Sequence, residues 1–136
     1  MQPEDAAFME QALIEARKGR FWAAPNPHVG CVIVANHEIL GRGFTQPVGG
    51  AHAEVMALSS CASPRGATAY VTLEPCAHQG HTGPCVEALI SAGVGRVVGA
   101  LKDPNPSVSG QGYDRLKAAG IAVTQGVCAE SAAAEL

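Results

Sequence analysis

The sequence predicts an α/β sandwich with a mixed sheet, and two observations support this fold class. First, a β-branched segment at residues 29–35 is followed by a short turn and a second extended segment at residues 38–44, which is typical of an antiparallel hairpin. Second, extended and amphipathic helical segments alternate over the rest of the chain, as they do where helices cover a partly parallel sheet. The 136 residues are about one domain in length, and 47% of them are hydrophobic, which is enough for one buried core.

The first half of the chain is expected to contain a helix, the hairpin and a second helix. Apolar residues recur on one helical face over residues 4–18, and Gly19 can end that helix. Asn36 and His37 suit the turn of the hairpin. A further helix is expected over residues 53–61.

The second half is expected to alternate strands with helices. The expected strands are residues 67–73, 95–101 and 121–127. The expected helices are residues 84–92 and 113–120, and another begins within residues 129–136. Pro84 suits a first helical turn, which needs no N–H from it, and Gly93 and Gly120 lie where helices commonly end.

Composition and charge argue against several classes of partner. The net charge is −3, and the nine Lys and Arg residues are scattered rather than gathered with aromatic rings as in a nucleic-acid groove. The amino-terminal segment is acidic and has no apolar export signal, and other apolar stretches are broken by Pro, Gly or charge. We therefore expect a cytoplasmic protein that binds neither nucleic acid nor membranes and whose five cysteines stay reduced.

The segment TLEPCAHQGHTGPC, residues 72–85, contains two candidate metal ligands. Cys76 follows the expected strand at its carboxyl end, and Cys85 lies in the first turn of the next helix. The partial positive charge of a helix amino terminus favours the thiolate. Two such positions at one edge of a sheet can converge on a single ion.

The segment HAEVMAL supplies a third ligand and an acid. His52 and Glu54 lie at the entrance of the expected helix, so His52 can turn to the metal while Glu54 points into the pocket beside it. Three protein ligands with an open fourth position describe a catalytic zinc site. His-x-Glu combined with Pro-Cys and a second Cys is typical of zinc deaminases, in which the Glu is a general acid/base rather than a ligand. We expect one zinc ion per chain.

Less specific interpretations apply to the other cysteines and histidines. Cysteines in a half-apolar chain usually fill the core, which we expect for Cys31, Cys61 and Cys128. His28 and His37 are expected at the surface or in turns. A structural zinc module without chemistry is a further alternative. It would need a fourth protein ligand, for which His78 or His81 is the obvious candidate.

Four segments together carry a family resemblance that covers nearly the whole chain: PNPHVGCVIV, HAEVMAL, VTLEPCAHQGHTGPC and DPNPSVSGQGYDRLKAAGI. They resemble the deaminase half of the bifunctional riboflavin-biosynthesis deaminase/reductase, a cytidine-deaminase-like zinc deaminase. The resemblance implies a three-layer α/β/α sandwich with a central five-stranded mixed sheet. It also implies hydrolytic deamination of 2,5-diamino-6-(5-phosphoribosylamino)pyrimidin-4(3H)-one to 5-amino-6-(5-phosphoribosylamino)uracil and ammonia.

The resemblance also implies roles for individual residues. The zinc ligands correspond to His52, Cys76 and Cys85, the proton shuttle to Glu54, and substrate contacts to three further positions: Asn26, Asp103 and Asn105. Two positions expected near the substrate depart from the family, which commonly has a histidine at Thr45 and a lysine or arginine at His81. These departures leave the zinc chemistry intact and concern how the phosphoribosyl group is held.

Some alternatives stay open at the level of the sequence. A zinc deaminase of this kind could instead act on another base, a nucleoside or a tRNA adenosine, although the long gap between the cysteines and the DPNP motif argue against it. We expect residues 1–136 to form one zinc-dependent pyrimidine deaminase domain without the family's carboxyl-terminal, NADPH-dependent reductase. The abrupt ending AAAEL favours an excised domain over a stand-alone enzyme. The family's habit suggests a homo-oligomer.

Overall fold

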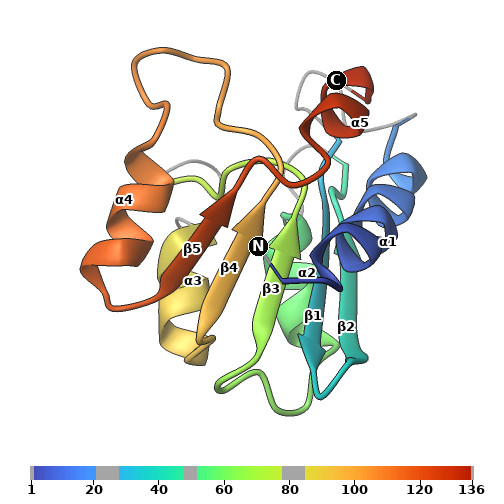
Figure 1. The fold of residues 1–136 in the computed structure, drawn as a ribbon, viewed down its shortest axis with the longest axis vertical. Helices are drawn as coiled ribbons and strands as arrows, with labels where there is room; N and C mark the ends of the chain where they lie inside the picture. Colours follow the sequence, from blue (N-terminus) through green and yellow to red (C-terminus); the bar gives the residue numbers. More distant parts are fainter. Residues whose placement is uncertain (1, 21–27, 48–51, 78–84, 136) are drawn as a thin grey trace.

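The computed structural model describes residues 2–20, 28–47, 52–77 and 85–135, and it confirms the predicted five-stranded mixed sheet between layers of helices (Figure 1). The strands are β1 Gly30–Ala35, β2 Glu38–Phe44, β3 Thr68–Val71, β4 Arg96–Gly99 and β5 Ala122–Gln125. The helices are α1 Asp5–Lys18, α2 Ala53–Ser59, α3 Cys85–Ala92, α4 Gln111–Ala118 and α5 Ala129–Ala134. Within these described segments, no helix combines the length and the apolar character needed to cross a membrane.

The sheet has the strand order β2-β1-β3-β4-β5. β1 is antiparallel to both β2 and β3, whereas β3, β4 and β5 run parallel to one another. The carboxyl ends of these three parallel strands therefore lie at one edge of the sheet. This edge carries the segments that follow β3 and β4, which contain the candidate site residues Cys76, Asp103 and Asn105.

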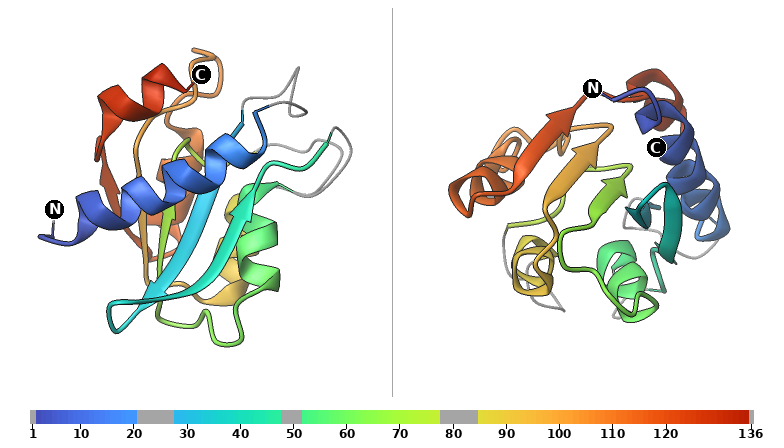
Figure 2. Two further views of the ribbon diagram at one scale, coloured as in Figure 1. Left: turned by 90° about the vertical axis from the view of Figure 1, so that its right-hand side faces the viewer. Right: turned by 60° about the horizontal axis from the view of Figure 1, so that its bottom comes forward.

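Two layers of helices bury the two faces of the sheet, because side chains alternate along each strand. In β1, Cys31 and Ile33 pack in a core with α2, α3 and α4, while Val32 and Val34 pack in a second core with α1 and α5. The views in Figure 2 show α1 and α5 on the opposite side of the sheet from α2 and α3. The predicted three-layer arrangement is thus confirmed.

Element boundaries differ from the predictions by a few residues. β3 ends at Val71 rather than at residue 73, although the Thr72 N–H still donates to the Gly30 carbonyl, at 3.1 Å. α4 begins at Gln111, two residues before the predicted start at residue 113. Gly110 precedes it in a left-handed conformation with φ of 88°, which glycine adopts without steric cost.

A buried ion pair fastens α1 to the sheet. Asp5 is fully buried and accepts two hydrogen bonds from Arg96 of β4, at 2.9 and 2.7 Å, and one from the Tyr70 hydroxyl, at 2.7 Å. The Arg96 guanidinium also donates to the Thr124 hydroxyl, at 2.9 Å. Hydrogen bonding to Arg96 holds the pKa of Asp5 far below its usual value, despite the opposing effect of burial. Asp5 therefore stays charged, and its charge is compensated within the core.

Replacing Arg96 should cost much more stability than replacing a surface arginine. Arg96→Gln leaves the buried Asp5 carboxylate without its cation, so the free energy of unfolding should fall by about 3 kcal/mol. Arg115→Gln is the matched control, because Arg115 pairs with Glu87 at the surface, where both side chains are more than 40% exposed. The control should lose less than about 1 kcal/mol. Urea unfolding measures both, and equal losses would contradict a special role for the buried pair.

Candidate active site

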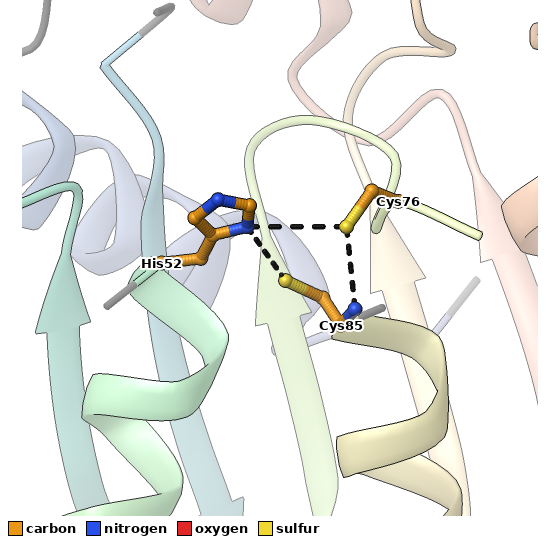
Figure 3. A group of neighbouring side chains, drawn as sticks. All are labelled: His52, Cys76 and Cys85. Atoms are coloured by element: carbon orange, nitrogen blue, oxygen red, sulfur yellow. Dashed lines mark hydrogen bonds between the residues drawn. The ribbon is translucent and has the colours of Figure 1, made fainter. Parts of the chain in front are cut away.

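The structure brings together three side chains that the sequence predicted to converge. His52 precedes the first residue of α2, Cys76 lies in the segment after β3, and Cys85 is the first residue of α3. Their ligand atoms all lie within 4.8 Å of one another. The His52 Nδ1 atom is 2.9 Å from the Cys85 Sγ atom and 3.9 Å from the Cys76 Sγ atom. Figure 3 shows the three side chains pointing toward a common centre.

Local backbone structure orients these side chains. His52 occupies the N-cap position of α2 in an extended conformation, and its carbonyl accepts the Met56 N–H at 3.0 Å. At the start of α3, the Cys85 N–H donates to the Cys76 Sγ atom at 3.2 Å, and the Val86 N–H donates to the Cys76 carbonyl at 3.1 Å. The amino terminus of α3 therefore binds the segment that carries Cys76, as expected for a thiolate at a helix amino terminus.

The two cysteines differ in acidity. Hydrogen bonds from the Cys85 thiol, from His52 and from the Cys85 backbone lower the pKa of Cys76 to about 4, although burial opposes the shift. The hydrogen bond to Cys76, together with burial, raises the pKa of Cys85, and the same thiolate raises the pKa of His52. Ionisation of Cys76 thus disfavours ionisation of Cys85, and binding of a metal ion would favour deprotonation of both thiols.

Glu54 lies in the first turn of α2 and is almost fully buried, with 4% of its surface exposed. The pKa of Glu54 is raised to about 7, chiefly by burial and also by the Cys76 thiolate, against the lowering effects of a backbone hydrogen bond, His52 and Cys85. A carboxyl group with this pKa can accept and return a proton near neutral pH. It lies beside the three ligand atoms without being one of them.

A cavity of about 140 Å³ opens beside this cluster. Six polar or ionisable residues and three apolar ones make up its described lining: Val29, Thr45, His52, Ala53, Glu54, Leu73, Glu74, Cys76 and Asp103. A cavity of about 150 Å³ can hold a benzene ring. The space next to Glu54 is thus of the size of one six-membered ring.

Only some of the residues predicted to contact the substrate line this cavity. Thr45 and Asp103 line it. The Thr45 hydroxyl also accepts the Val29 N–H at 2.9 Å, which helps to hold it in place. Asn105 is exposed and does not line the described part of the cavity. Asn26 and His81 lie outside the described residues.

The expectations for the remaining cysteines and histidines are mostly confirmed. Cys31 and Cys61 are buried in the core, whereas Cys128 is only partly buried at the edge of the second core. His37 lies in the hairpin turn with φ of 62°. His28 is instead mostly covered, and its Nε2 atom lies 3.4 Å from a carboxylate oxygen of Glu135.

One residue at the cavity was not singled out from the sequence. Glu74 is 6% exposed, lines the cavity and accepts hydrogen bonds from a neighbouring loop. The sequence does contain an indication of its role, because Glu74 is a charged residue that follows a buried strand. A charged side chain buried at such a position requires hydrogen-bonding or charged partners.

Comparison with known proteins identifies relatives of the whole chain. Residues 2–101 match the model of the cytidine and deoxycytidylate deaminase zinc-binding region. The riboflavin biosynthesis protein RibD of Escherichia coli is 54% identical over 91% of this chain, which spans 34% of that protein. The diaminohydroxyphosphoribosylamino-pyrimidine deaminase of Buchnera aphidicola from Acyrthosiphon pisum is 48% identical over 90% of this chain and 84% of its own length.

A solved structure agrees with these sequence matches. Acinetobacter baumannii RibD superimposes with a TM-score of 0.95 and 50% identity, over 97% of this chain and 38% of that chain. The chain thus spans about a third of the length of the RibD relatives. The resemblance inferred from the sequence motifs is confirmed: the chain belongs to the cytidine and deoxycytidylate deaminase zinc-binding family and, within it, to the deaminases of riboflavin biosynthesis.

Proposed function

We propose that the chain catalyses the zinc-dependent hydrolytic deamination of 2,5-diamino-6-(5-phosphoribosylamino)pyrimidin-4(3H)-one, which yields 5-amino-6-(5-phosphoribosylamino)uracil and ammonia. The observation that carries this proposal is the cluster of His52, Cys76 and Cys85 beside the buried Glu54, at the end of a ring-sized cavity. The name of the Buchnera relative, of which this chain covers 84%, supports the choice of substrate.

The chemistry of the donor atoms fits zinc. Two thiolates and an imidazole nitrogen suit a tetrahedral Zn²⁺ site with one position left for water or substrate. In the part of the chain that the structure describes, no fourth His, Cys, Asp or Glu joins this group. We assign His52, Cys76 and Cys85 as the ligands of one ion per chain. When bound, zinc supplies a Lewis acid that lowers the pKa of a water molecule toward about 7.

Glu54 moves the protons of the reaction. Its carboxylate accepts the proton that the attacking water releases and returns it to a ring nitrogen, which makes the neighbouring carbon electrophilic. In a second transfer the same carboxylate moves the proton of the newly added hydroxyl group to the amine, which leaves as ammonia while the carbonyl forms. The pKa of about 7 suits both directions of transfer.

The substrate is held by polar groups around the cavity. Asp103 and Thr45 contact its ring or ribose from the described lining. We further assign substrate contacts to Asn26, His81 and Asn105 on the family resemblance. Hydrogen-bonding groups of this kind discriminate against analogues that lack the matching partner.

The lengths of the relatives support a second domain in the complete protein. The RibD proteins are about three times as long as this chain. This difference supports the proposal that residues 1–136 form the deaminase domain and that an NADPH-dependent reductase domain accompanies it in the complete protein. A homo-oligomeric assembly stays a prediction from the family resemblance.

Removal of either cysteine ligand should remove the metal. Cys76→Ser and Cys85→Ser each take away one of three protein ligands, so zinc content should fall from about one per chain to a small fraction, with some loss of stability. Cys128→Ser is the matched control, since Cys128 lies outside the cluster, and it should keep its zinc. Elemental analysis of the purified proteins measures the difference. Stoichiometric zinc in both ligand variants would show that the ligands are misassigned.

A substrate panel tests the reaction itself. The wild-type protein should deaminate the diaminopyrimidine phosphate with a higher kcat/KM than cytidine, guanine or tRNA, as measured by ammonia release. Glu54→Gln should keep its zinc and lose about 100- to 10,000-fold in turnover, because positioned proton transfer contributes about that much.

Glu87→Gln is the matched control for this variant. It removes the same charge from an exposed position of α3, so its turnover should equal that of the wild type. Faster turnover of cytidine, guanine or tRNA would refute the proposed substrate. A Glu54→Gln variant within a few-fold of the wild type would place the proton transfer elsewhere.

A further inference from the structure

We propose that Glu74 is a positioning residue, which holds the loop of residues 101–110 against the cavity and so places Asp103 for the substrate. This inference rests on the proposed function, because Asp103 is assigned there as a substrate contact. Glu74 itself belongs to the segment between β3 and Cys76, close to one of the cluster residues. It therefore connects the metal-binding segment with the substrate loop.

The Glu74 carboxylate is hydrogen-bonded to both ends of this loop. Its Oε1 atom accepts the N–H groups of Asp103 and Gly110, both at 2.9 Å. Its Oε2 atom accepts the N–H of Tyr113 at 3.1 Å. One side chain with 6% exposure thus brings together backbone groups from residues 103 to 113. Ionised carboxylates form stronger hydrogen bonds to N–H groups than neutral acceptors do.

The same carboxylate replaces a missing helix cap. The N-cap residue of α4 is Gly110, which has no side chain to bind the free N–H groups of the first turn. Glu74 accepts the N–H of this N-cap residue and of Tyr113, the third residue of the helix. Its negative charge also lies at the positive end of the helix dipole. This contact from another segment explains why α4 begins before the predicted position.

Backbone contacts from the same segment fix the start of the loop. The Glu74 N–H donates to the Leu101 carbonyl at 2.9 Å, and the Tyr113 hydroxyl donates to that carbonyl at 2.7 Å. A Cβ atom at Gly112 would collide with the Pro75 carbonyl, so α4 packs directly against the segment that carries Glu74. The loop is therefore anchored at its start, at Asp103 and at its end.

Inside the loop, hydrogen bonds are local. The Asp103 side chain accepts the Asn105 N–H at 2.9 Å, and the Asn105 side chain accepts the Ser107 N–H at 3.0 Å. These bonds shape the loop but do not tie it to the cavity. Two hydrogen bonds of the described residues connect residues 102–110 to the segment after β3. In both of them the acceptor is the Glu74 carboxylate. Beyond the backbone anchor at Leu101, this carboxylate thus holds the rest of the loop in place.

The variant Glu74→Gln tests this role with almost no change in volume. The amide keeps one acceptor oxygen and replaces the other by an NH₂ group, which cannot accept an N–H. We expect faster amide hydrogen exchange at Asp103, Gly110 and Tyr113, with the amides of β4 unchanged. We also expect a KM for the diaminopyrimidine phosphate raised by about 10-fold, as the loss of a charged hydrogen bond implies. Zinc content should stay the same, and kcat should change less than KM.

Two further variants separate positioning from general stability. Glu15→Gln is the matched control: Glu15 is also buried, at 2% exposure, but lies on α1 and pairs with Lys18 and Arg42. This variant should lose stability without a change in KM or in exchange of the loop amides. Glu74→Asp keeps both acceptor oxygens on a side chain one methylene shorter, so its KM should rise less than that of Glu74→Gln.

The two measurements also distinguish this inference from the proposed function. If the wild-type protein does not turn over the diaminopyrimidine phosphate, the proposed function fails, while the exchange rates still decide whether Glu74 holds the loop. Unchanged exchange of the three amides in Glu74→Gln would overturn the inference. An unchanged KM in a folded, zinc-loaded Glu74→Gln or, if that variant does not fold, in Glu74→Asp would overturn it as well.

Discussion

The meeting of three chain segments at the carboxyl end of β3 is the constraint on which the site depends. His52 approaches Cys85 because α2 packs against β2, β1 and α3. Two glycines of β2 allow this contact, since a Cβ atom at Gly41 or Gly43 would collide with backbone carbonyls of α2. The sheet positions the other two ligands, because the segment that follows β3 places Cys76 at the amino terminus of α3, where Cys85 lies. Packing of helices against strands therefore sets the spacing of the three ligand atoms.

The site also gathers three acidic side chains, Cys76, Cys85 and Glu54, that disfavour one another's ionisation. The Cys76 thiolate raises the pKa of Glu54, and Cys76 and Glu54 both raise the pKa of the Cys85 thiol. A divalent cation bound between the thiolates would compensate this charge and favour deprotonation of both cysteines. By contrast, the buried charge of Asp5 is neutralised within the protein by Arg96. The cluster at Cys76 is thus suited to binding a metal ion, whereas the pair of Asp5 and Arg96 stabilises the fold.

Most of the fold and the metal-binding cluster could be predicted from the sequence, because they follow from local patterns. Strand and helix periodicity placed Cys76 and Cys85 at element ends on one edge of the sheet, and the structure brings them together with His52. The role of Glu74 could not be predicted in this way. Its partners are backbone N–H groups 29 to 39 residues away, and such contacts leave no periodic signal. The early start of α4 could not be predicted for the same reason, because the side chain that caps this helix belongs to another segment.

We propose above that the cluster holds a catalytic zinc ion with three protein ligands. X-ray absorption spectroscopy at the zinc edge tests it most directly on the purified chain. We expect two sulfur neighbours at about 2.3 Å, one imidazole nitrogen at about 2.0 Å and one further light atom that does not belong to an imidazole. A closed site with two sulfur atoms and two imidazole nitrogens would contradict it, because no position would then be left for water or substrate.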